Sequence, residues 1–339
     1  FITGGDDGWV CVWDVRSPYV PLSSRQMGCP VRAVALHPSP SAPTVAVGLE
    51  NGKIDILDYE TLSTVQSIKA GEESVYVLRY APNGSILAAV ASDSQVQLFA
   101  VERNYEVYGF LAGGHKLFIT HLDWDVSSTF MVTNGADYEV SFWEVAKMHL
   151  VANKYAMRNV EWATYTCPLS WATCGIWQGK SNGTDINSVA RSANRRLLAV
   201  ADDAGLVQIY RFPAWHADAR AISMHVHANF VTKAVFVGDA FLVCTGGVDG
   251  TVAVLALQPD LDAVLTGIGG GQSSSSSSLM SGKTLSGKAS PRLSAQTPSP
   301  SSRLSLVRRL SSSGTSSGMN AAGMSPRGGE GERQRPLSA

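Results

Sequence analysis

The chain has 339 residues, of which 45% are apolar, so it can bury a large core. Its formal net charge of -1 combines two opposed regions: residues 1–262 hold 18 basic and 26 acidic residues, whereas residues 263–339 hold 9 basic and 2 acidic residues. No apolar run approaches the ~18 residues that a membrane-spanning helix needs, so we expect no membrane partner.

The first fifteen residues resemble the end of a repeat that continues along the chain. Thr3, Asp7 and Trp13 are separated by four and six residues, and these intervals recur later. Phe1 already lies in an expected strand, so we expect the intact protein to include upstream sequence.

Five further units share one internal spacing. Their first strands are expected to begin at Val31, Val75, Ile119, Ile186 and Val231, with spacings of 44, 44, 67 and 45 residues. A large apolar or aromatic residue follows 24 positions later, or 26 in the first of these units. These residues are Leu57, Phe99, Trp143, Tyr210 and Leu255. A period of about 40 to 45 residues with four short strands is typical of a β-propeller blade.

Turn-forming residues separate the expected strands. Asn51-Gly52, Ala136-Asp137 and Asp249-Gly250 each precede a third strand, which indicates an antiparallel meander. We therefore predict an all-β fold: an incomplete β-propeller of about five and a half repeats in residues 1–262. The predicted units are about 1–15, 16–59, 60–102, 103–146, 147–212 and 213–257.

Polar residues recur at fixed offsets from the strand starts. They match the buried tetrad of WD repeats, in which aspartate, histidine, a hydroxyl and an indole N–H are hydrogen-bonded in series. The predicted structural residues are His115, Thr133, Asp137 and Trp143, then His227, Thr245 and Asp249, and in the opening half-unit Thr3, Asp7 and Trp13. The same residue types form hydrolase triads, but catalysis needs one constellation at one cleft, so this repetition predicts a structural role.

Longer motifs resemble one family within the WD-repeat class. They are Gly-His at 114–115, Ile-Thr-His-Leu-Asp-Trp at 119–124, Arg-Asn-Val-Glu-Trp-Ala-Thr-Tyr-Thr-Cys at 158–167, Gly-Ile-Trp at 175–177 and Gly-Thr-Asp-Ile-Asn-Ser-Val at 183–189. Together they resemble the C-terminal WD-repeat propeller of the echinoderm microtubule-associated-protein-like family, over most of residues 1–257. Leu255 departs from the family pattern, which has a closing tryptophan there, and so does the Ser-rich tail.

The resemblance implies a cytoskeletal protein of the cytoplasm that binds tubulin or microtubules, with cilium or axoneme as further locations. It implies a protein partner and not nucleic acid. Family members commonly carry an upstream propeller and a basic, coiled-coil N-terminal region, which the resemblance makes the expected source of oligomerisation. This sequence does not contain those parts.

The spacing of 67 residues marks an insertion from about 146 to 185. Four aromatic residues in it form either a ligand cage or a cluster packed on the blade edge, and packing is the commoner role. They are Trp162, Tyr165, Trp171 and Trp177.

Residues 263–339 change to Gly, Ser, Pro and basic residues, and we predict a disordered tail because so few large apolar residues cannot offset the entropy of ordering. Short kinase motifs make it a candidate for phosphorylation. The candidate sites are Ser290, Thr297, Ser299, Ser311 and Ser325.

Propellers bind partners mainly through their connecting loops, and acidic turn residues suggest a partner face at Asp6, Glu50 and Asp202. Two alternatives stay open: a general scaffold without tubulin binding, in an axoneme or a ubiquitin-ligase adaptor, and an enzyme. An enzyme would need extra His, Asp or Glu outside the tetrads, and no such cluster is evident. Five cysteines without close pairing favour reduced thiols, so we predict no metal and no cofactor.

Overall fold

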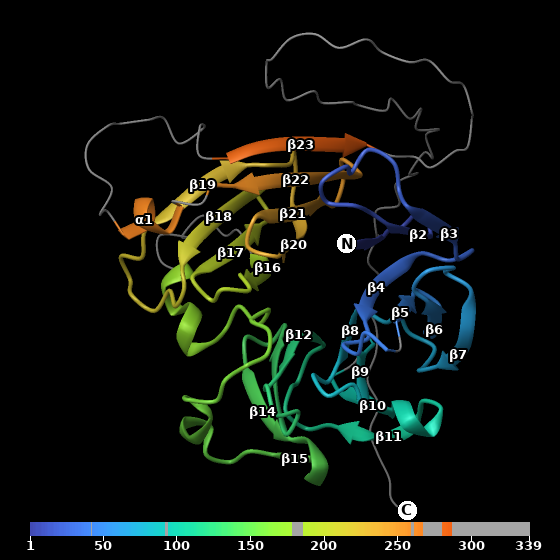
Figure 1. The fold of residues 1–339 in the computed structure, drawn as a ribbon. Helices are drawn as coiled ribbons and strands as arrows, with labels where there is room; N and C mark the ends of the chain where they lie inside the picture. The colour runs from blue at the N-terminus through green and yellow to red at the C-terminus, as the bar shows by residue number, and fades with distance from the viewer. Residues whose placement is uncertain (42, 92–93, 178–185, 259–260, 267–279, 287–339) are drawn as a thin grey trace, which may run out of the picture.

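Short apolar strands and tight turns form six antiparallel sheets, the blades, arranged around a common centre (Figure 1). The computed structural model describes residues 1–41, 43–91, 94–177, 186–258, 261–266 and 280–286. The predicted fold class, an all-β propeller, is confirmed. Among the described residues, no helix is long and apolar enough to span a membrane.

Within each blade the strands follow one another in chain order. Blade 1 contains β1 (Ile2–Gly4), β2 (Trp9–Val12) and β3 (Ser23–Gln26). Blade 2 contains β4 (Val31–Leu36), β5 (Thr44–Leu49), β6 (Lys53–Asp58) and β7 (Thr64–Lys69). Blade 3 contains β8 (Val77–Tyr80), β9 (Ile86–Val90), β10 (Val96–Ala100) and β11 (Glu106–Leu111).

The second half of the ring is built in the same way. Blade 4 contains β12 (Ile119–Trp124), β13 (Phe130–Gly135), β14 (Val140–Glu144) and β15 (His149–Leu150). Blade 5 contains β16 (Ile186–Arg191), β17 (Leu197–Asp202), β18 (Leu206–Arg211) and β19 (Ala221–His225). Blade 6 contains β20 (Val231–Val237), β21 (Phe241–Gly246), β22 (Thr251–Leu257) and β23 (Met280–Ser286). The helices are η1 (Val101–Arg103), η2 (Val145–Lys147), η3 (Lys154–Met157), η4 (Trp171–Trp177) and α1 (Leu261–Thr266).

The first strands of the blades lie nearest the centre of the ring, and last strands such as β7, β15 and β23 lie at its rim (Figure 1). The sheets are one strand out of phase with the sequence units. Unit 16–59, for example, holds β3 of blade 1 and then β4 to β6 of blade 2. Each sequence unit therefore joins two neighbouring blades.

The core lies mainly between neighbouring blades. Val10 and Val12 of blade 1 pack with Val45 and Val47 of blade 2, and clusters of the same kind join blades 2 and 3, 3 and 4, and 5 and 6. This packing explains the apolar first strands, which are covered on both faces. Between blades 4 and 5 the insertion supplies much of the packing instead.

Glycine is required in the turn between β5 and β6, because this turn approaches the backbone that follows β7. Gly52, between β5 and β6, has φ +76°, and a Cβ there would lie 2.1 Å from the carbonyl oxygen of Gly71. A side chain cannot be placed at that distance, so the Asn51-Gly52 turn depends on its glycine.

The structure differs from the sequence prediction at the end of the domain. Helix α1 crosses the predicted boundary at residue 262, and β23 pairs antiparallel with β22 from Thr251↔Ser286 to Leu257↔Met280. The composition of this segment predicted a disordered tail. Strand addition to an open edge uses backbone groups, which composition does not report. The rest of the predicted tail lies outside the described residues.

Candidate interaction surface

Blade 4 contains a complete four-residue hydrogen-bond series. The indole N–H of Trp143 donates to Thr133 Oγ1 at 2.9 Å, and Thr133 Oγ1 lies 2.8 Å from His115 Nε2. His115 Nδ1 lies 3.1 Å from Asp137 Oδ1. Burial raises the pKa of Asp137, but hydrogen bonds from the Lys116 amide, from His115 and from the Glu139 amide outweigh it and lower that pKa to about 2. The carboxylate is thus held ionised.

This geometry leaves no reactive hydroxyl. Thr133 is fully buried and already bonded on two sides, so no substrate can reach it. Gly135 permits the arrangement, because a Cβ there would lie 2.6 Å from His115 Nδ1 and 2.5 Å from Asp137 Oδ1. The series connects three segments of one blade, as a structural device would.

The other two predicted series are partial. In blade 1 the Trp13 indole donates to Thr3 Oγ1 at 2.8 Å, while Asp7 Oδ1 accepts the Trp9 amide at 3.0 Å. In blade 6, His227 Nδ1 lies 2.9 Å from Asp249 Oδ2, but the buried His227 Nε2 has no partner.

The prediction for Thr245 is wrong. Thr245 Oγ1 lies 2.6 Å from Thr232 Oγ1, and the hydrogen bonds of the His227 ring within the described residues go to Asp249 and Thr251 instead. The register gives the reason: Leu122 pairs with Thr133 in blade 4, whereas the corresponding residue of blade 6, Ala234, pairs with Cys244. The paired positions are 11 residues apart in blade 4 and 10 in blade 6, so the β20–β21 turn is one residue shorter and the hydroxyl position holds the buried Cys244.

The predicted acidic face divides into an exposed pair and a buried group. Arg32, at the start of β4, bridges Asp6 at 2.5 Å and Glu50 at 2.7 Å, and the two acidic side chains are 79% and 46% exposed. Asp202 is only 2% exposed, and its Oδ1 accepts the amides of Ala204 and Leu206 at 3.0 Å each. The prediction that Asp202 is a surface residue is corrected, because its carboxylate stabilises the turn after β17.

The end of blade 4 that carries the β13–β14 turn has an exposed apolar patch, which the sequence analysis did not predict. Leu117 and Phe118 precede β12, Tyr138 lies in the turn between β13 and β14, and their exposures are 52%, 53% and 69%. The Ala136 amide donates to the Phe118 carbonyl at 2.9 Å, which holds the two loops together. We call Leu117, Phe118 and Tyr138 the turn-end patch.

The insertion packs against blades 4 and 5, in line with the packing alternative for its aromatic residues. Phe142 of β14 stacks on Trp162 at 5.9 Å and on Trp171 at 5.7 Å between ring centroids. Tyr165 meets Phe212 edge to face at 4.8 Å. The Trp177 indole donates to the Pro168 carbonyl at 3.1 Å, so these rings do not form an open cage.

One buried carboxylate anchors the insertion to the central strands. Asp123 of β12 accepts the amides of Thr166 and Cys167 at 2.7 and 2.9 Å, and the Thr164 hydroxyl at 2.5 Å. Arg79 of β8 donates to the Thr164 and Thr166 hydroxyls at 3.1 and 3.3 Å. Blades 3 and 4 are thereby tied to the insertion near the centre of the ring.

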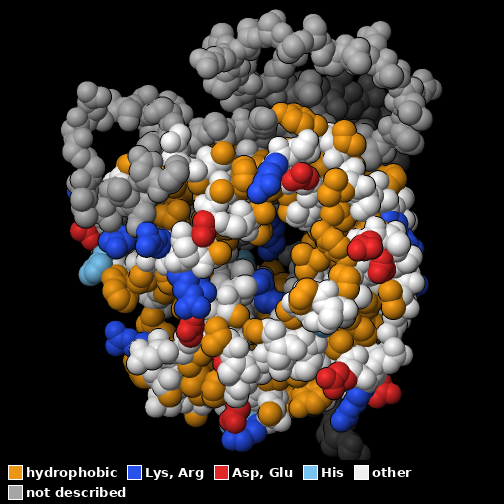
Figure 2. Space-filling view, viewed as in Figure 1, with side chains coloured by type: hydrophobic (Ala, Val, Ile, Leu, Met, Phe, Trp, Pro, Cys, Tyr) orange, Lys and Arg blue, Asp and Glu red, His pale blue; other side chains and the backbone are white. Residues whose placement is uncertain are grey.

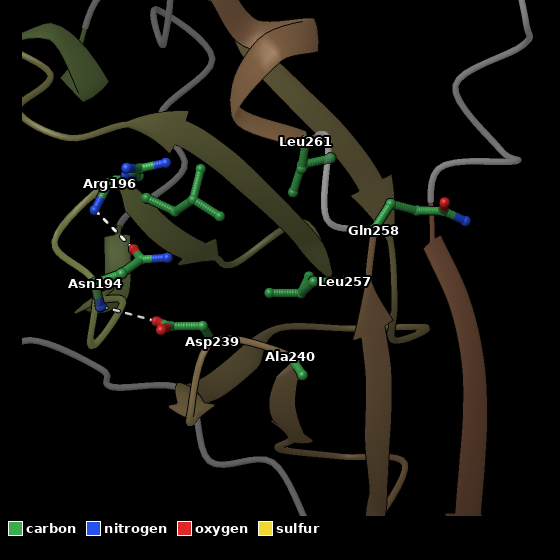
Figure 3. A pocket seen from close by; sticks show the side chains of 8 residues that line it. Asn194, Arg196, Asp239, Ala240, Leu257, Gln258 and Leu261 are labelled. Carbon is green, nitrogen blue, oxygen red and sulfur yellow. Dashed lines mark hydrogen bonds between the residues drawn. The ribbon is translucent and has the colours of Figure 1, made fainter.

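Blades 5 and 6 border a pocket of about 340 Å³ (Figure 3). Its polar groups are engaged with one another: the Asn194 amide donates to Asp239 at 2.8 Å, and the Arg196 amide donates to Asn194 Oδ1 at 3.0 Å. Leu257 and Leu261 supply an apolar wall. Among the described lining residues, no nucleophile is paired with a base.

The cysteines and the candidate phosphorylation sites are the remaining groups that the sequence singled out. The five cysteines are free, and within the described ranges no three His, Cys, Asp or Glu side chains are grouped to hold a metal ion. Burial raises the pKa of Cys11 to about 11 and that of Cys244 to about 12. The five candidate phosphorylation sites, Ser290, Thr297, Ser299, Ser311 and Ser325, lie outside the described residues.

Comparison with known proteins decides the family. The family model described as the echinoderm microtubule-associated protein second beta-propeller matches residues 1–257. The chain belongs to the echinoderm microtubule-associated protein family. The resemblance drawn from the sequence motifs is therefore confirmed.

Three relatives show the extent of the match. The chain is 36% identical over 252 residues to the 77 kDa echinoderm microtubule-associated protein of Strongylocentrotus purpuratus, covering 74% of this chain and 36% of the relative. It is 38% identical over 255 residues to echinoderm microtubule-associated protein-like 2 of Homo sapiens, covering 74% and 39%. It is 37% identical over 257 residues to echinoderm microtubule-associated protein-like 3 of Mus musculus, covering 74% and 28%. The chain thus spans less than two fifths of the length of these relatives.

Proposed function

We propose that this chain is a non-catalytic protein of the cytoskeleton that binds tubulin or microtubules through its propeller and influences microtubule organisation. The observation that carries the proposal is the family match over residues 1–257, which covers every blade up to β22. The relatives are named as microtubule-associated proteins.

The binding surface we propose is the end of the ring that carries the turns between second and third strands. It presents the turn-end patch of blade 4 together with the acidic pair Asp6 and Glu50 of blades 1 and 2. Exposed aromatic groups beside charged groups are typical of protein interfaces, because they bury a large area at low conformational cost.

Co-sedimentation of the full chain with microtubules, at low and physiological salt, tests the proposal, with immobilised free tubulin as a second bait. The test variant combines Phe118→Ser with Tyr138→Asn, since Asn tolerates the φ of +59° at position 138. The matched control is Tyr155→Ser, which removes a ring that is 81% exposed on the insertion. We expect the double variant to lose at least fivefold in affinity and the control to keep it.

Equal microtubule binding by the double variant and by the Tyr155→Ser control would show that the turn-end patch is not part of the binding surface. Failure of the unmodified chain to bind microtubules and free tubulin would replace the proposal with the general scaffold function.

The tail is a second contributor to this proposed function. Residues 263–339 carry a net charge of +7 and would attract an acidic partner, while each phosphate adds about -1.5 to -2. Roughly four phosphates would cancel the attraction. A variant with Asp at all five candidate phosphorylation sites should bind microtubules more weakly at low salt. The substituted residues are Ser290, Thr297, Ser299, Ser311 and Ser325. Unchanged binding of this variant would exclude the charge switch.

A further inference from the structure

Charged side chains from three blades meet near the centre of the ring. Arg79 lies on β8 of blade 3, Asp123 on β12 of blade 4 and Lys233 on β20 of blade 6. Arg79 Nη1 is 3.9 Å from Asp123 Oδ1, and Lys233 interacts electrostatically with both. Blades 3 and 6 are separated by two blades on either side, so their first strands face one another across the ring (Figure 1). We call Arg79, Asp123 and Lys233 the channel cluster.

The surroundings of Lys233 identify its position more closely. Solvent reaches the side chain, yet burial by the surrounding protein lowers the pKa of Lys233 to about 8, with Arg79 lowering it further and Asp123 raising it. Lys233 is exposed on β20, the first strand of blade 6 and the strand of that blade nearest the centre of the ring, so it lies beside the central hollow. Figure 2 shows a hollow near the middle of the ring with Lys or Arg side chains at its edge.

One donor of this cluster is buried without a partner, and one cation is exposed. The Nε of Arg79 is buried without a hydrogen-bond partner, although its other nitrogens donate to Thr164 and Thr166. Within the described residues, Lys233 Nζ has neither a hydrogen bond nor an ion pair within 4.0 Å. The buried Arg79 Nε favours an acceptor in this region, because an unpaired buried donor is costly, while the exposed ammonium of Lys233 is accessible to a ligand.

We propose that the channel cluster binds a single carboxylate of an acidic peptide, with Lys233 and Arg79 as the groups that hold it. The inference does not depend on tubulin binding, because any glutamate-rich segment has the required chemistry.

The charge of the cluster favours a monoanion. Two cations and the fixed carboxylate of Asp123 leave one net positive charge, which a carboxylate neutralises and a phosphate dianion would exceed. His121 and Cys167 also face the cluster, and both stay neutral at physiological pH: burial lowers the pKa of His121 to about 3 and raises the pKa of Cys167. β16 contributes the uncharged Ser188, whose hydroxyl accepts the Ala234 amide at 3.2 Å, and Arg191, which interacts electrostatically with Asp123 and also with Glu161 of the insertion.

The first test measures protection of one amine in the full chain. Limited acylation with acetic anhydride, mapped by mass spectrometry, gives the modification rates of Lys233 and of the exposed Lys53 on β6. Hexaglutamate is the probe, hexaglutamine its uncharged control, and inorganic phosphate a separate arm. We expect saturating hexaglutamate to slow acylation of Lys233 at least fivefold and to leave Lys53 unchanged. Equal rates at Lys233 with and without hexaglutamate, or protection by phosphate and not by the peptide, would overturn the proposal.

The second test follows binding of labelled hexaglutamate between pH 7 and pH 9. Loss of the Lys233 proton should weaken binding about tenfold over this range, whereas the Lys and Arg residues of the tail keep their charge. Lys233→Arg should bind without this pH dependence, and Lys233→Met should bind weakly at both pH values. Lys53→Met is the matched control and should behave like the unmodified chain. An identical pH profile for Lys233→Met and the unmodified chain would exclude Lys233 as a ligand.

Discussion

Blades 4 and 6 have the same four-strand plan but differ in how they satisfy a buried histidine. In blade 4, His115 has partners at both ring nitrogens, and Trp143 completes the series. In blade 6, His227 keeps its aspartate but its Nε2 has no acceptor or donor, because Cys244 and Leu255 occupy the positions of the hydroxyl and the indole. The comparison teaches that the blade fold tolerates an open series when apolar packing replaces it.

The largest expected effect comes from giving blade 4 the residue of blade 6. Trp143→Leu removes a fully buried ring, leaves a cavity and takes one of the hydrogen-bond partners from the Thr133 hydroxyl. We expect a loss of about 3 to 5 kcal/mol in the free energy of unfolding, measured by urea denaturation of the full chain. Leu255→Met in blade 6 is the volume-conserving control, and it should cost less than about 1.5 kcal/mol. A loss below 1 kcal/mol for Trp143→Leu would show that the tetrad does not stabilise the blade.

Substitutions of Thr133 in blade 4 and of Thr245 in blade 6 compare the two blades at a single hydroxyl. Thr133→Val leaves His115 and the Trp143 indole without their shared partner, so we expect a loss of about 3 kcal/mol. Thr245→Val removes only the contact with Thr232, and about 1 kcal/mol is the expected loss. Urea unfolding of both variants measures the difference. Equal losses would mean that Thr245 has the tetrad role that the register denies it.

The contributions of Asp137 and Asp249 to stability should differ in their dependence on pH. The pKa of Asp137 is about 2 in the folded state, below its unfolded value of about 3.9, so its contribution is present above pH 4 and is lost as the pH falls towards 2. We expect about 2 kcal/mol to disappear over this range, measured by urea unfolding at several pH values. Asp137→Asn should be less stable at pH 7 and should flatten the profile. The pKa of Asp249 is also lowered, but its side chain is more exposed, at 23% against 10%, so Asp249→Asn should flatten the profile less.

The repeat was predictable from the sequence because it depends on local spacing. Val31, Ile119, Ile186 and Val231 begin β4, β12, β16 and β20, and Val75 lies two residues before β8. Each landmark of the third strand lies on the expected strand. These positions are buried between blades, so the fold requires apolar residues there. The resulting pattern can be recognised in a single sequence.

Features that depend on register or on distant segments were not predictable in the same way. A constant offset selected Thr245, but the β20–β21 turn, shorter by one residue than the β12–β13 turn, places Cys244 in that position. The members of the channel cluster are 44 and 110 residues apart, and only the ring brings them together. A signal was present, since Arg79, Asp123 and Lys233 are each the one residue with a permanent charge in a first strand that is otherwise apolar or uncharged.

The smallest expected effect concerns one hydroxyl that blade 4 has and blade 6 lacks. Ser141 Oγ donates to the Gly114 carbonyl at 2.8 Å, and Ser141 pairs with Thr133 as Ala253 pairs with Cys244. Ser141→Ala thus gives blade 4 another residue of blade 6. It removes one neutral hydrogen bond from a side chain that is 4% exposed, so we expect a loss of about 1 kcal/mol by urea unfolding. In the Trp143→Leu background the same substitution should cost less, because Gly114 packs against the Trp143 ring and its loop would already be loosened. Full additivity of the two changes would instead show that the loop of His115 is held independently of the tryptophan.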